Sequence, residues 1–127
     1  MVETFGSFIT RKREERDYTL RSLAGKLGIS AVYLCNMEKN RRHDPADEIL
    51  DNLAAFLLLS KDEKAEMLDL LAKAQKRPTV ASDLPEYINE HDIVRVALRT
   101  AKDVDATDED WEEFIERLQQ RIKRDGG

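Results

Sequence analysis

Residues 20–42, LRSLAGKLGISAVYLCNMEKNRR, hold two short apolar runs at helical spacing, and only a few residues separate them. Four apolar residues of the first run fall on one helix face: Leu20, Leu23, Ala24 and Leu27. Gly28 follows directly, where a helix end favours a residue that tolerates positive φ, and Ile29 supplies an apolar plug for the turn. Ser30 can then cap a second helix. The stretch therefore predicts two short helices joined by a tight turn.

The second helix of this pair combines inward and outward residues. Leu34 and Met37 supply inward contacts, and Asn40 stands where the helix ends and where a left-handed cap is tolerated. A helix, a tight turn and a second helix at a steep angle let the second helix enter a DNA major groove while the first braces across the backbone. Two such helices also occur as ordinary core, so periodicity alone leaves both interpretations open.

The rest of the chain is patterned for helices as well, and the predicted fold class is all-α. Residues 5–16 place Phe5, Phe8 and Ile9 on one helix face, and Thr19 can cap the helix that starts at residue 20. In a fourth helix, residues 46–59, the side chains expected to be buried are Ile49, Leu50, Leu53, Ala54, Leu57 and Leu58. Ser60 caps a fifth, residues 61–76, whose apolar stripe is Ala65, Met67, Leu68, Leu71 and Ala72.

A change in composition divides the chain. Residues 77–87, RPTVASDLPEY, hold two of the three prolines among small polar residues, which is typical of a connector. We expect a helix-turn-helix domain in residues 1–76, a linker in 77–84 and a C-terminal helical extension in 85–127. Within the extension, residues 91–103 are helical, and Thr107 with Asp110 forms an acidic capping box for a last helix. One face of that helix carries Trp111, Phe114, Ile115, Leu118 and Ile122.

Charge is distributed unevenly along the chain. The net charge of −5 argues, for the whole chain, against a nucleic-acid binder. Residues 1–42, however, hold nine Lys and Arg against five Asp and Glu, a net charge of +4. Residues 43–80 have a net charge of −3 and residues 81–127 one of −6. The basic excess therefore coincides with the predicted helix pair.

Residues 19–42 resemble the helix-turn-helix of the XRE, or Cro/C1-repressor-like, family, whose usual pattern is close to LA-x-x-LGIS-x-x-YLS-x-IE-x-G-x-R. The chain matches this pattern at Leu23, Ala24, Leu27, Gly28, Ile29, Ser30, Tyr33, Leu34, Glu38 and Arg42. The resemblance covers residues 5–74 and implies a five-helix lambda-repressor-like domain. Leu20 departs from the pattern because many members have Gln there, and Cys35, Met37 and Asn40 replace the common Ser, Ile and Gly.

The resemblance implies a role for individual residues in binding double-stranded DNA. Base edges would be contacted by Ser30, Ala31, Val32 and Asn36, with Asn36 suited to adenine and the two apolar side chains to thymine methyl groups. Phosphates would be contacted by Arg21, Lys26, Lys39, Arg41 and Arg42, which position the protein rather than specify sequence. The implied function is a sequence-specific transcriptional regulator, most simply a dimeric repressor that inserts residues 30–39 into the major groove.

Less specific interpretations stand beside these roles. Arg41 and Arg42 also fit solvated loop charges, and Tyr33 either leans on the DNA backbone or packs into the core. Residues 11–16, RKREER, suggest a solvated helix face. The family resemblance implies in addition that Arg13 forms an ion pair with Glu38.

Neither catalysis nor a cofactor is indicated by the sequence. The two histidines, His43 and His91, lie far apart in sequence, and no HExxH motif or Gly-rich phosphate loop occurs. Cys35 is the only cysteine and has no neighbouring base, so it fits a packed residue better than a nucleophile. We therefore predict no catalytic residue, no metal site and no cofactor. The absence of a leader pattern or a membrane-length apolar run predicts a cytoplasmic protein without a membrane partner.

The C-terminal extension raises a second hypothesis. Its acidic amphipathic helix must bury the stripe of Trp111, Phe114, Ile115 and Leu118 against its own domain, a second copy or another protein. Tails of this kind resemble those of some XRE-type regulators that work with an antitoxin or metallopeptidase partner. The alternative function is therefore an antitoxin-like protein that restrains a toxin or metallopeptidase and regulates its own promoter.

Overall fold

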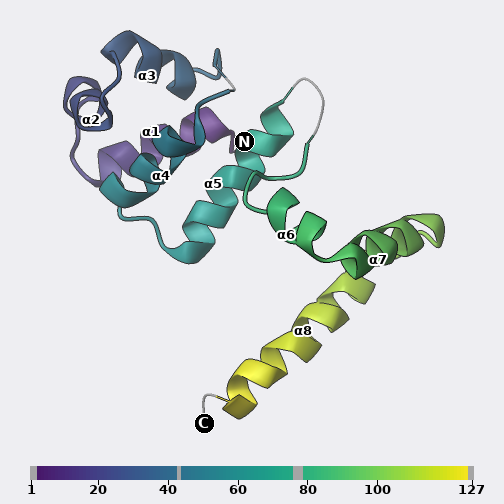
Figure 1. Cartoon of the computed structure of the whole chain (residues 1–127). Coiled ribbons are helices and arrows are strands. Elements are labelled where there is room, and N and C mark those ends of the chain that lie inside the picture. Colours follow the sequence, from purple (N-terminus) through teal and green to yellow (C-terminus); the bar gives the residue numbers. More distant parts are fainter. Residues whose placement is uncertain (1–2, 43, 76–78, 126–127) are drawn as a thin grey trace. The chain divides into compact units, whose positions relative to one another are not determined.

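The computed structural model describes residues 3–42, 44–75 and 79–125. These residues form helices and no strand, which confirms the all-α prediction. The helices are α1 (Phe5–Glu15), α2 (Leu20–Leu27), α3 (Ala31–Glu38), α4 (Asp47–Phe56), α5 (Lys61–Ala74), α6 (Pro85–Glu90), α7 (Asp92–Asp103) and α8 (Asp108–Asp125) (Figure 1). The chain divides into two compact units, residues 1–85 and residues 86–127.

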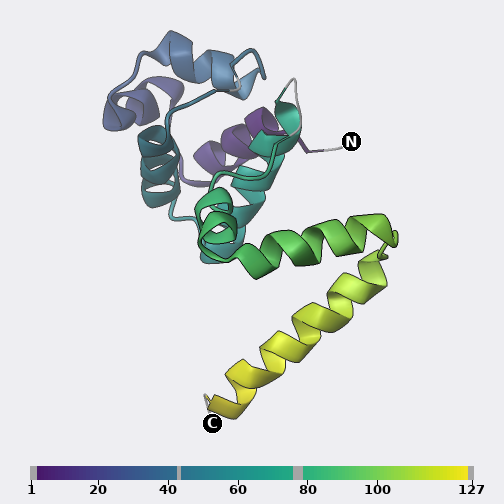
Figure 2. The same cartoon turned by 45° about the vertical axis from the view of Figure 1, so that its right-hand side comes forward.

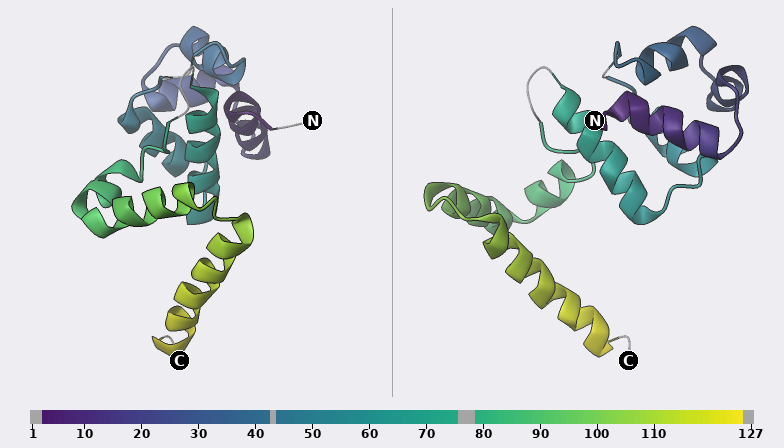
Figure 3. Two further views of the ribbon diagram at one scale, coloured as in Figure 1. Left: turned by 90° about the vertical axis from the view of Figure 1, so that its right-hand side faces the viewer. Right: turned by 180° about the vertical axis from the view of Figure 1, so that it is seen from behind.

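Unit 1 is built around the apolar faces of α1 to α5. α1 packs against both α3 and α5, and α2 packs against α3 and α4. α1 is the central helix of the unit and is amphipathic as predicted, because Phe5, Phe8 and Ile9 are completely buried. Figures 1 and 3 show α3 at the edge of this unit, next to α1 and α2. One side of α3 therefore remains open to solvent.

Helix caps explain where the elements of unit 1 begin. Thr19 accepts a hydrogen bond from the Ser22 backbone N–H (3.0 Å), and Ser22 Oγ in turn accepts one from the Thr19 N–H (2.9 Å). Ser60 and Glu63 form the same reciprocal box at the start of α5. Ser30 caps α3 as predicted, accepting from the Tyr33 N–H at 3.0 Å. These local hydrogen bonds satisfy N–H groups that have no partner within their helix.

Asn40 connects the end of α3 to the start of α1. Its φ of 60° confirms the predicted left-handed conformation. Its side chain accepts a hydrogen bond from the Gly6 N–H (2.9 Å) and donates one to Thr4 Oγ1 (2.9 Å). Gly6 permits this close approach, since a Cβ there would lie 2.3 Å from the Glu38 carbonyl oxygen. The two helices are therefore joined by backbone contact rather than by side chains alone.

The predicted core differs from the observed core at the end of α4 and in α5. Leu58 was expected to be buried, but α4 ends at Phe56 and Leu58 adopts a φ of 53° with 66% of its surface exposed. Leu57, which was also predicted to be buried, is completely buried at the turn. Ala65 is also exposed rather than part of the α5 stripe. Leaving the helix at residue 57 rotates the next side chain away from the core.

The connector between the predicted domains is more structured than expected. Ala81 is buried in the core of unit 1, and the short helix α6 starts at Pro85. Residues 76–78 lie outside the described residues, so the predicted domain limits at 76 and 84 stay a prediction.

Unit 2 contains α7, α8 and most of α6. Figure 2 shows α7 and α8 diverging from the turn that joins them. Thr107 and Asp110 form the predicted capping box at the start of α8, with reciprocal hydrogen bonds of 2.9 and 3.2 Å. No residue of α7 is fully buried. The hairpin therefore leaves much of its apolar surface uncovered.

Candidate nucleic-acid interface

The turn between α2 and α3 has the geometry that the sequence predicts. Gly28 adopts a φ of 71°, and its N–H and that of Ile29 both bond to the last turn of α2, with Ile29 donating to the Ala24 carbonyl at 3.1 Å. Ile29 packs against the core from the turn, and Ala24 is buried beneath it. Gly28 is favoured here because other residues rarely tolerate positive φ. The turn fixes the direction in which α3 leaves α2.

The outer face of α3 carries a stripe of three residues. Leu34 and Met37 are completely buried and anchor the opposite face. Val32, Asn36 and Lys39 recur at i, i+4 and i+7, so they share one side of the helix. Val32 (71% of its surface) and Lys39 are exposed, and Asn36 is half-buried. No intramolecular hydrogen bond of the Asn36 side chain occurs in the described part of the chain, so its amide is available to a ligand.

The other two residues predicted to contact bases lie differently. Ser30 is exposed, but its hydroxyl already accepts the Tyr33 N–H and caps α3. Ala31 is half-buried and packs against the core. Ser30 and Ala31 therefore lie beside the N-terminal end of the Val32–Asn36–Lys39 stripe.

The cations of unit 1 fall into two groups. Those of α1 are neutralised internally: Arg11 bonds Glu3 and Glu15, Lys12 contacts Glu15 and Glu63, and Arg13 bonds Glu38. The prediction that residues 11–16 form a solvated face is therefore wrong for Lys12, which is buried. The ion pair between Arg13 and Glu38, which the family resemblance implied, is confirmed, and the Arg13 side chain is 13% exposed. The carboxylate partners of Arg13 and Lys12 come from α3 and α5, far away in sequence.

The cations predicted to contact phosphates form the second group. Arg21, Lys39, Arg41 and Arg42 are exposed, and none has a carboxylate partner within the described ranges. Lys26 is also exposed and has no carboxylate partner there, but its ammonium group lies over two rings, those of Tyr18 (6.0 Å) and Phe56 (5.7 Å). The five residues predicted to contact phosphates therefore lie on α2 and at the end of α3.

Sequence reasoning missed one contact of this surface. The Arg42 guanidinium carbon lies 5.0 Å from the centre of the Tyr33 ring, nine residues earlier in the chain. Tyr33 is half-buried and packs against the core from the first turn of α3. The sequence signal, an aromatic residue and an arginine on either side of a left-handed turn, is too weak to predict the pair.

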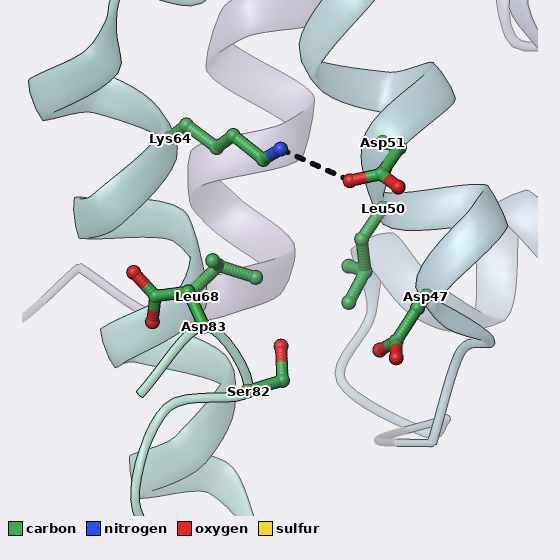
Figure 4. Close-up of a pocket in the computed structure, with 7 residues that line it drawn as sticks. All are labelled: Asp47, Leu50, Asp51, Lys64, Leu68, Ser82 and Asp83. Atoms are coloured by element: carbon green, nitrogen blue, oxygen red, sulfur yellow. Dashed lines mark hydrogen bonds and ion pairs between the residues drawn. The ribbon is translucent and has the colours of Figure 1, made fainter. Parts of the chain in front are cut away.

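The opposite sign of charge gathers elsewhere in unit 1. A hollow of about 170 Å³ between α4, α5 and residues 82–83 is lined by seven residues: Asp47, Leu50, Asp51, Lys64, Leu68, Ser82 and Asp83. Figure 4 shows the Lys64 ammonium group bonded to Asp51, at 3.0 Å, above this hollow. Three carboxylates around one lysine disfavour a phosphate. The structure thus separates an acidic surface on α4 and α5 from the basic one on α2 and α3.

The predicted partner-binding residues line an apolar groove in unit 2. Trp111 is half-buried, whereas Phe114, Ile115 and Leu118 are each exposed by 39–50%. The Trp111 and Phe114 rings meet edge to face with centroids 6.2 Å apart. Three of the four, Trp111, Phe114 and Leu118, line a groove of about 720 Å³ between α7 and α8. Ile93, Val96 and Leu98 continue its apolar lining on α7.

No group of three His, Cys, Asp or Glu side chains in the described residues is arranged to hold a metal ion, and His43 lies outside those residues. None of the helices in the described part of the chain has both the length and the apolar character that crossing a membrane requires.

Known proteins are similar to the N-terminal half of this chain. The helix-turn-helix family model HTH_3 matches residues 9–64. The HTH-type transcriptional regulator SinR of Bacillus subtilis (strain 168) is 35% identical over 65 residues, 48% of this chain and 59% of that protein. SinR of Bacillus licheniformis is 34% identical over 55 residues, 43% of this chain and 50% of that protein. The matches thus span little more than half the length of these relatives.

A similar solved structure is the SinR protein/SinI protein complex. Its matching chain has a TM-score of 0.48 and 25% identity, with 94% of this chain and 99% of that chain covered. The likeness depends instead on the HTH_3 match, on the SinR relatives and on the geometry of α2, the turn and α3. Residues 9–64 therefore carry a helix-turn-helix domain of the XRE type.

Proposed function

We propose that this protein is a sequence-specific DNA-binding transcriptional regulator, acting as a repressor, which inserts α3 into the major groove. The observation that carries the proposal is the combination of an outward stripe on α3 with exposed cations that have no carboxylate partner in the described residues. The basic side chains of α1 form ion pairs within the domain, whereas Arg21, Lys39, Arg41 and Arg42 remain available to bind phosphates. A surface that retains positive charge next to an open helix face suits a phosphate backbone on both sides of a groove.

The chemistry of the α3 stripe suits base edges. The Asn36 amide can donate to and accept from adenine N7 and N6 at once, and Val32 presents methyl groups to a thymine methyl. Ser30 and Ala31 extend this contact at the start of the helix. Lys39 continues the same face toward the backbone. The stripe therefore specifies sequence, and the flanking cations fix how deeply and in which register α3 lies.

The phosphate contacts divide by position. Arg21, at the start of α2, suits one strand of the backbone, and Arg41 with Arg42, beyond α3, suits the other. Lys26 is the least available of the five predicted residues, because its ammonium group lies over two aromatic rings, whereas Arg42 lies over one ring and its planar guanidinium keeps N–H groups free at the edge. We therefore assign it a weaker contact than the four others.

A dimer would supply the specificity that one helix lacks. One helix-turn-helix contacts few base pairs, whereas two related by a two-fold axis read two half-sites. The apolar groove of unit 2 is a suitable dimer interface, because a large exposed apolar surface indicates a protein partner. The N-terminal half of α8, residues 108–116, holds six Asp and Glu, whereas residues 117–123 hold three Arg and Lys and no acid. This separation favours two copies whose α8 helices run antiparallel, since each acidic half then faces a basic half.

The same groove supports a second candidate function. An apolar groove with a volume of about 720 Å³, lined by aromatic side chains, also suits a helix of a different protein. In this alternative, unit 2 restrains a toxin or metallopeptidase and the helix-turn-helix domain regulates the shared promoter. The two functions differ in which molecule fills the groove.

DNA binding is tested by selecting sites from a random duplex library and measuring affinity by fluorescence anisotropy over a series of salt concentrations. We expect a recovered consensus with two related half-sites, bound at least a thousand-fold more tightly than random duplex. The logarithm of the association constant should fall linearly with the logarithm of salt concentration. Equal affinity for the selected and the random duplex at every salt concentration would exclude the repressor.

The dimer is tested by sedimentation of the full chain. Phe114→Glu places a charge in the apolar groove and should convert a dimer to a monomer. Gln120→Glu adds the same charge on the opposite side of α8 and should leave the dimer intact. A purified wild-type chain that sediments as a monomer at every concentration would favour the restraint of another protein. Binding of the monomer to its consensus half-site would then still identify a DNA-binding protein.

A further inference from the structure

We infer that Tyr33 is a positioning residue for DNA binding, because its ring holds the Arg42 guanidinium beside the reading face of α3 before DNA arrives. The inference rests on the proposed DNA-binding function. It assigns to Tyr33 a role other than packing, and to Arg42 a more ordered state than that of a loop arginine. Two features produce this arrangement. The left-handed turn at Asn40 directs the chain back along α3, and the Tyr33 ring contacts the Arg42 guanidinium.

The turn after α3 is held at several points. Asn40 has a φ of 60°, and its amide is bonded to both the Gly6 N–H and Thr4 Oγ1 at the start of α1. The Arg41 N–H donates to the Asn36 carbonyl at 2.8 Å. Because these bonds anchor the turn to α1 and to α3, the backbone that carries Arg42 has little freedom.

The ring that receives Arg42 is itself fixed. Tyr33 lies on the first turn of α3, and its backbone N–H donates a hydrogen bond to Ser30 Oγ. Its half-buried side chain packs against the core. The Arg42 guanidinium carbon lies 5.0 Å from the ring centre, within the range of a cation–π contact. A planar guanidinium stacks on a ring and keeps its N–H groups free at the edge. Arg42 therefore remains able to bind an anion while it is held.

The position of the pair gives it a function. Tyr33 and Asn36 are three residues apart on α3, so they lie on neighbouring sides of the helix. The guanidinium is therefore presented at the edge of the Val32–Asn36–Lys39 stripe, where the phosphate backbone would pass. A side chain that is ordered in the free protein loses less conformational entropy on binding. Arg41, its neighbour, is exposed and has no ring contact among the described side chains, and so serves as the internal control.

The first test uses the free protein. Nitrogen-15 relaxation of the arginine Nε–Hε groups should give Arg42 a higher order parameter than Arg41. Tyr33→Leu should lower the Arg42 value to that of Arg41, and Tyr33→Phe, which keeps the ring, should leave it unchanged. Equal order parameters of Arg42 and Arg41 in the wild type would overturn the inference without touching the proposed function. This measurement on the wild type needs no variant to fold.

The second test is a double-mutant cycle in binding to the selected consensus duplex. Tyr33→Leu should weaken binding about two- to five-fold, the effect of one exposed cation–π contact, and Tyr33→Phe should restore it. Arg42→Ala should weaken binding and reduce the salt slope by about 0.9, whereas Tyr33→Leu should leave the slope unchanged. In the Arg42→Ala background, Tyr33→Leu should have no further effect. Additive losses would assign Tyr33 to packing alone, whereas a wild type that binds no duplex would contradict the proposed function instead.

Discussion

Arg13 on α1 and Glu38 at the end of α3 form a bidentate ion pair inside unit 1. The Arg13 Nε donates to Glu38 Oε2 at 2.9 Å and its Nη2 to Oε1 at 3.1 Å. Arg13 Nη1 also donates to the Tyr18 carbonyl at 2.9 Å, and Glu38 Oε1 also accepts from the Thr10 hydroxyl at 2.8 Å. The hydrogen bonds that Arg13 donates to Glu38 raise the pKa of Arg13 above its ordinary value. This pair, implied by the family resemblance, holds the C-terminal end of α3 on the domain.

Removing one charge of this pair should destabilise unit 1. Glu38→Gln keeps the size of the side chain but leaves the largely buried Arg13 without an opposite charge, so the free energy of unfolding should fall by about 3 kcal/mol. Glu14→Gln, on the exposed side of α1, is the control and should change it by less than about 0.5 kcal/mol. Urea unfolding followed by circular dichroism measures both. Equal effects of the two substitutions would contradict a stabilising role of the pair.

Acid should weaken the contact between α1 and α5. The hydrogen bond from Lys12 lowers the pKa of Glu63 from 4.5 to about 2, and the Ser60 N–H adds to the effect. A carboxylate with a lowered pKa in the folded state contributes stability above its unfolded pKa, and this contribution is lost as pH falls from 4.5 towards 2. Glu63→Gln keeps the capping geometry but cannot titrate. Its free energy of unfolding should therefore depend less on pH in this interval.

The measurement is denaturant unfolding at several pH values across that interval. Glu66→Gln, an exposed position of the same helix, is the matched control and should follow the wild type. If Glu63→Gln lost stability on acidification as steeply as the wild type, the Lys12–Glu63 contact would not be the source of the acid sensitivity.

Two glycines should respond to alanine in opposite directions. At Gly6 a Cβ would lie 2.3 Å from the Glu38 carbonyl oxygen and 2.7 Å from both the Met37 carbonyl and Asn40 Oδ1, so α1 and α3 must move apart. We expect Gly6→Ala to lower the free energy of unfolding by about 1–3 kcal/mol. Gly25 lies inside α2 with open space at its Cβ position, and Gly25→Ala should raise it by about 0.5–1 kcal/mol. Thermal melts of both variants measure the two changes. A Gly6→Ala variant at least as stable as the wild type would refute the close approach at Gly6.

Local features of the fold were predictable because they depend on residues three or four positions apart. The caps at Thr19, Ser30 and Ser60, the left-handed Gly28 and the left-handed Asn40 all follow from such short spacings. Their physical cause lies within one helical turn. The same holds for the buried faces of α1 and α3.

Features that depend on distant residues were not predictable. Lys12 looked solvated because its partner Glu63 is 51 residues away in sequence, and only the packing of α1 on α5 brings them together. Leu58 continued the apolar period of α4, but the period cannot tell at which residue a helix ends. At the candidate site, the positions of Val32 and Asn36 on one side of α3 followed from the family resemblance. The stacking of Arg42 on Tyr33 was not, because it depends on the direction of the turn.

Replacing Leu58, which adopts a left-handed conformation, should stabilise unit 1. A leucine at a φ of 53° is strained, since its Cβ crowds the backbone, and with 66% exposure it gains little from packing. Leu58→Gly should therefore raise the free energy of unfolding by about 1 kcal/mol. Its neighbour Leu57 is completely buried, and Leu57→Ala should lower the same quantity by about 2–5 kcal/mol. Destabilisation by Leu58→Gly would show that the exposed side chain makes a contact that matters.

Asn36 and Arg21 should separate specificity from affinity. Asn36→Ala removes the amide that can pair with one base, so the ratio of affinities for consensus and random duplex should fall by about five- to 150-fold, equivalent to 1–3 kcal/mol of discrimination. Arg21→Ala removes one phosphate contact, so binding to both duplexes should weaken alike and the salt slope should fall by about 0.9. Anisotropy titrations against both duplexes over the salt series measure each quantity. Equal effects of Asn36→Ala on both duplexes would remove Asn36 from the residues that read the sequence.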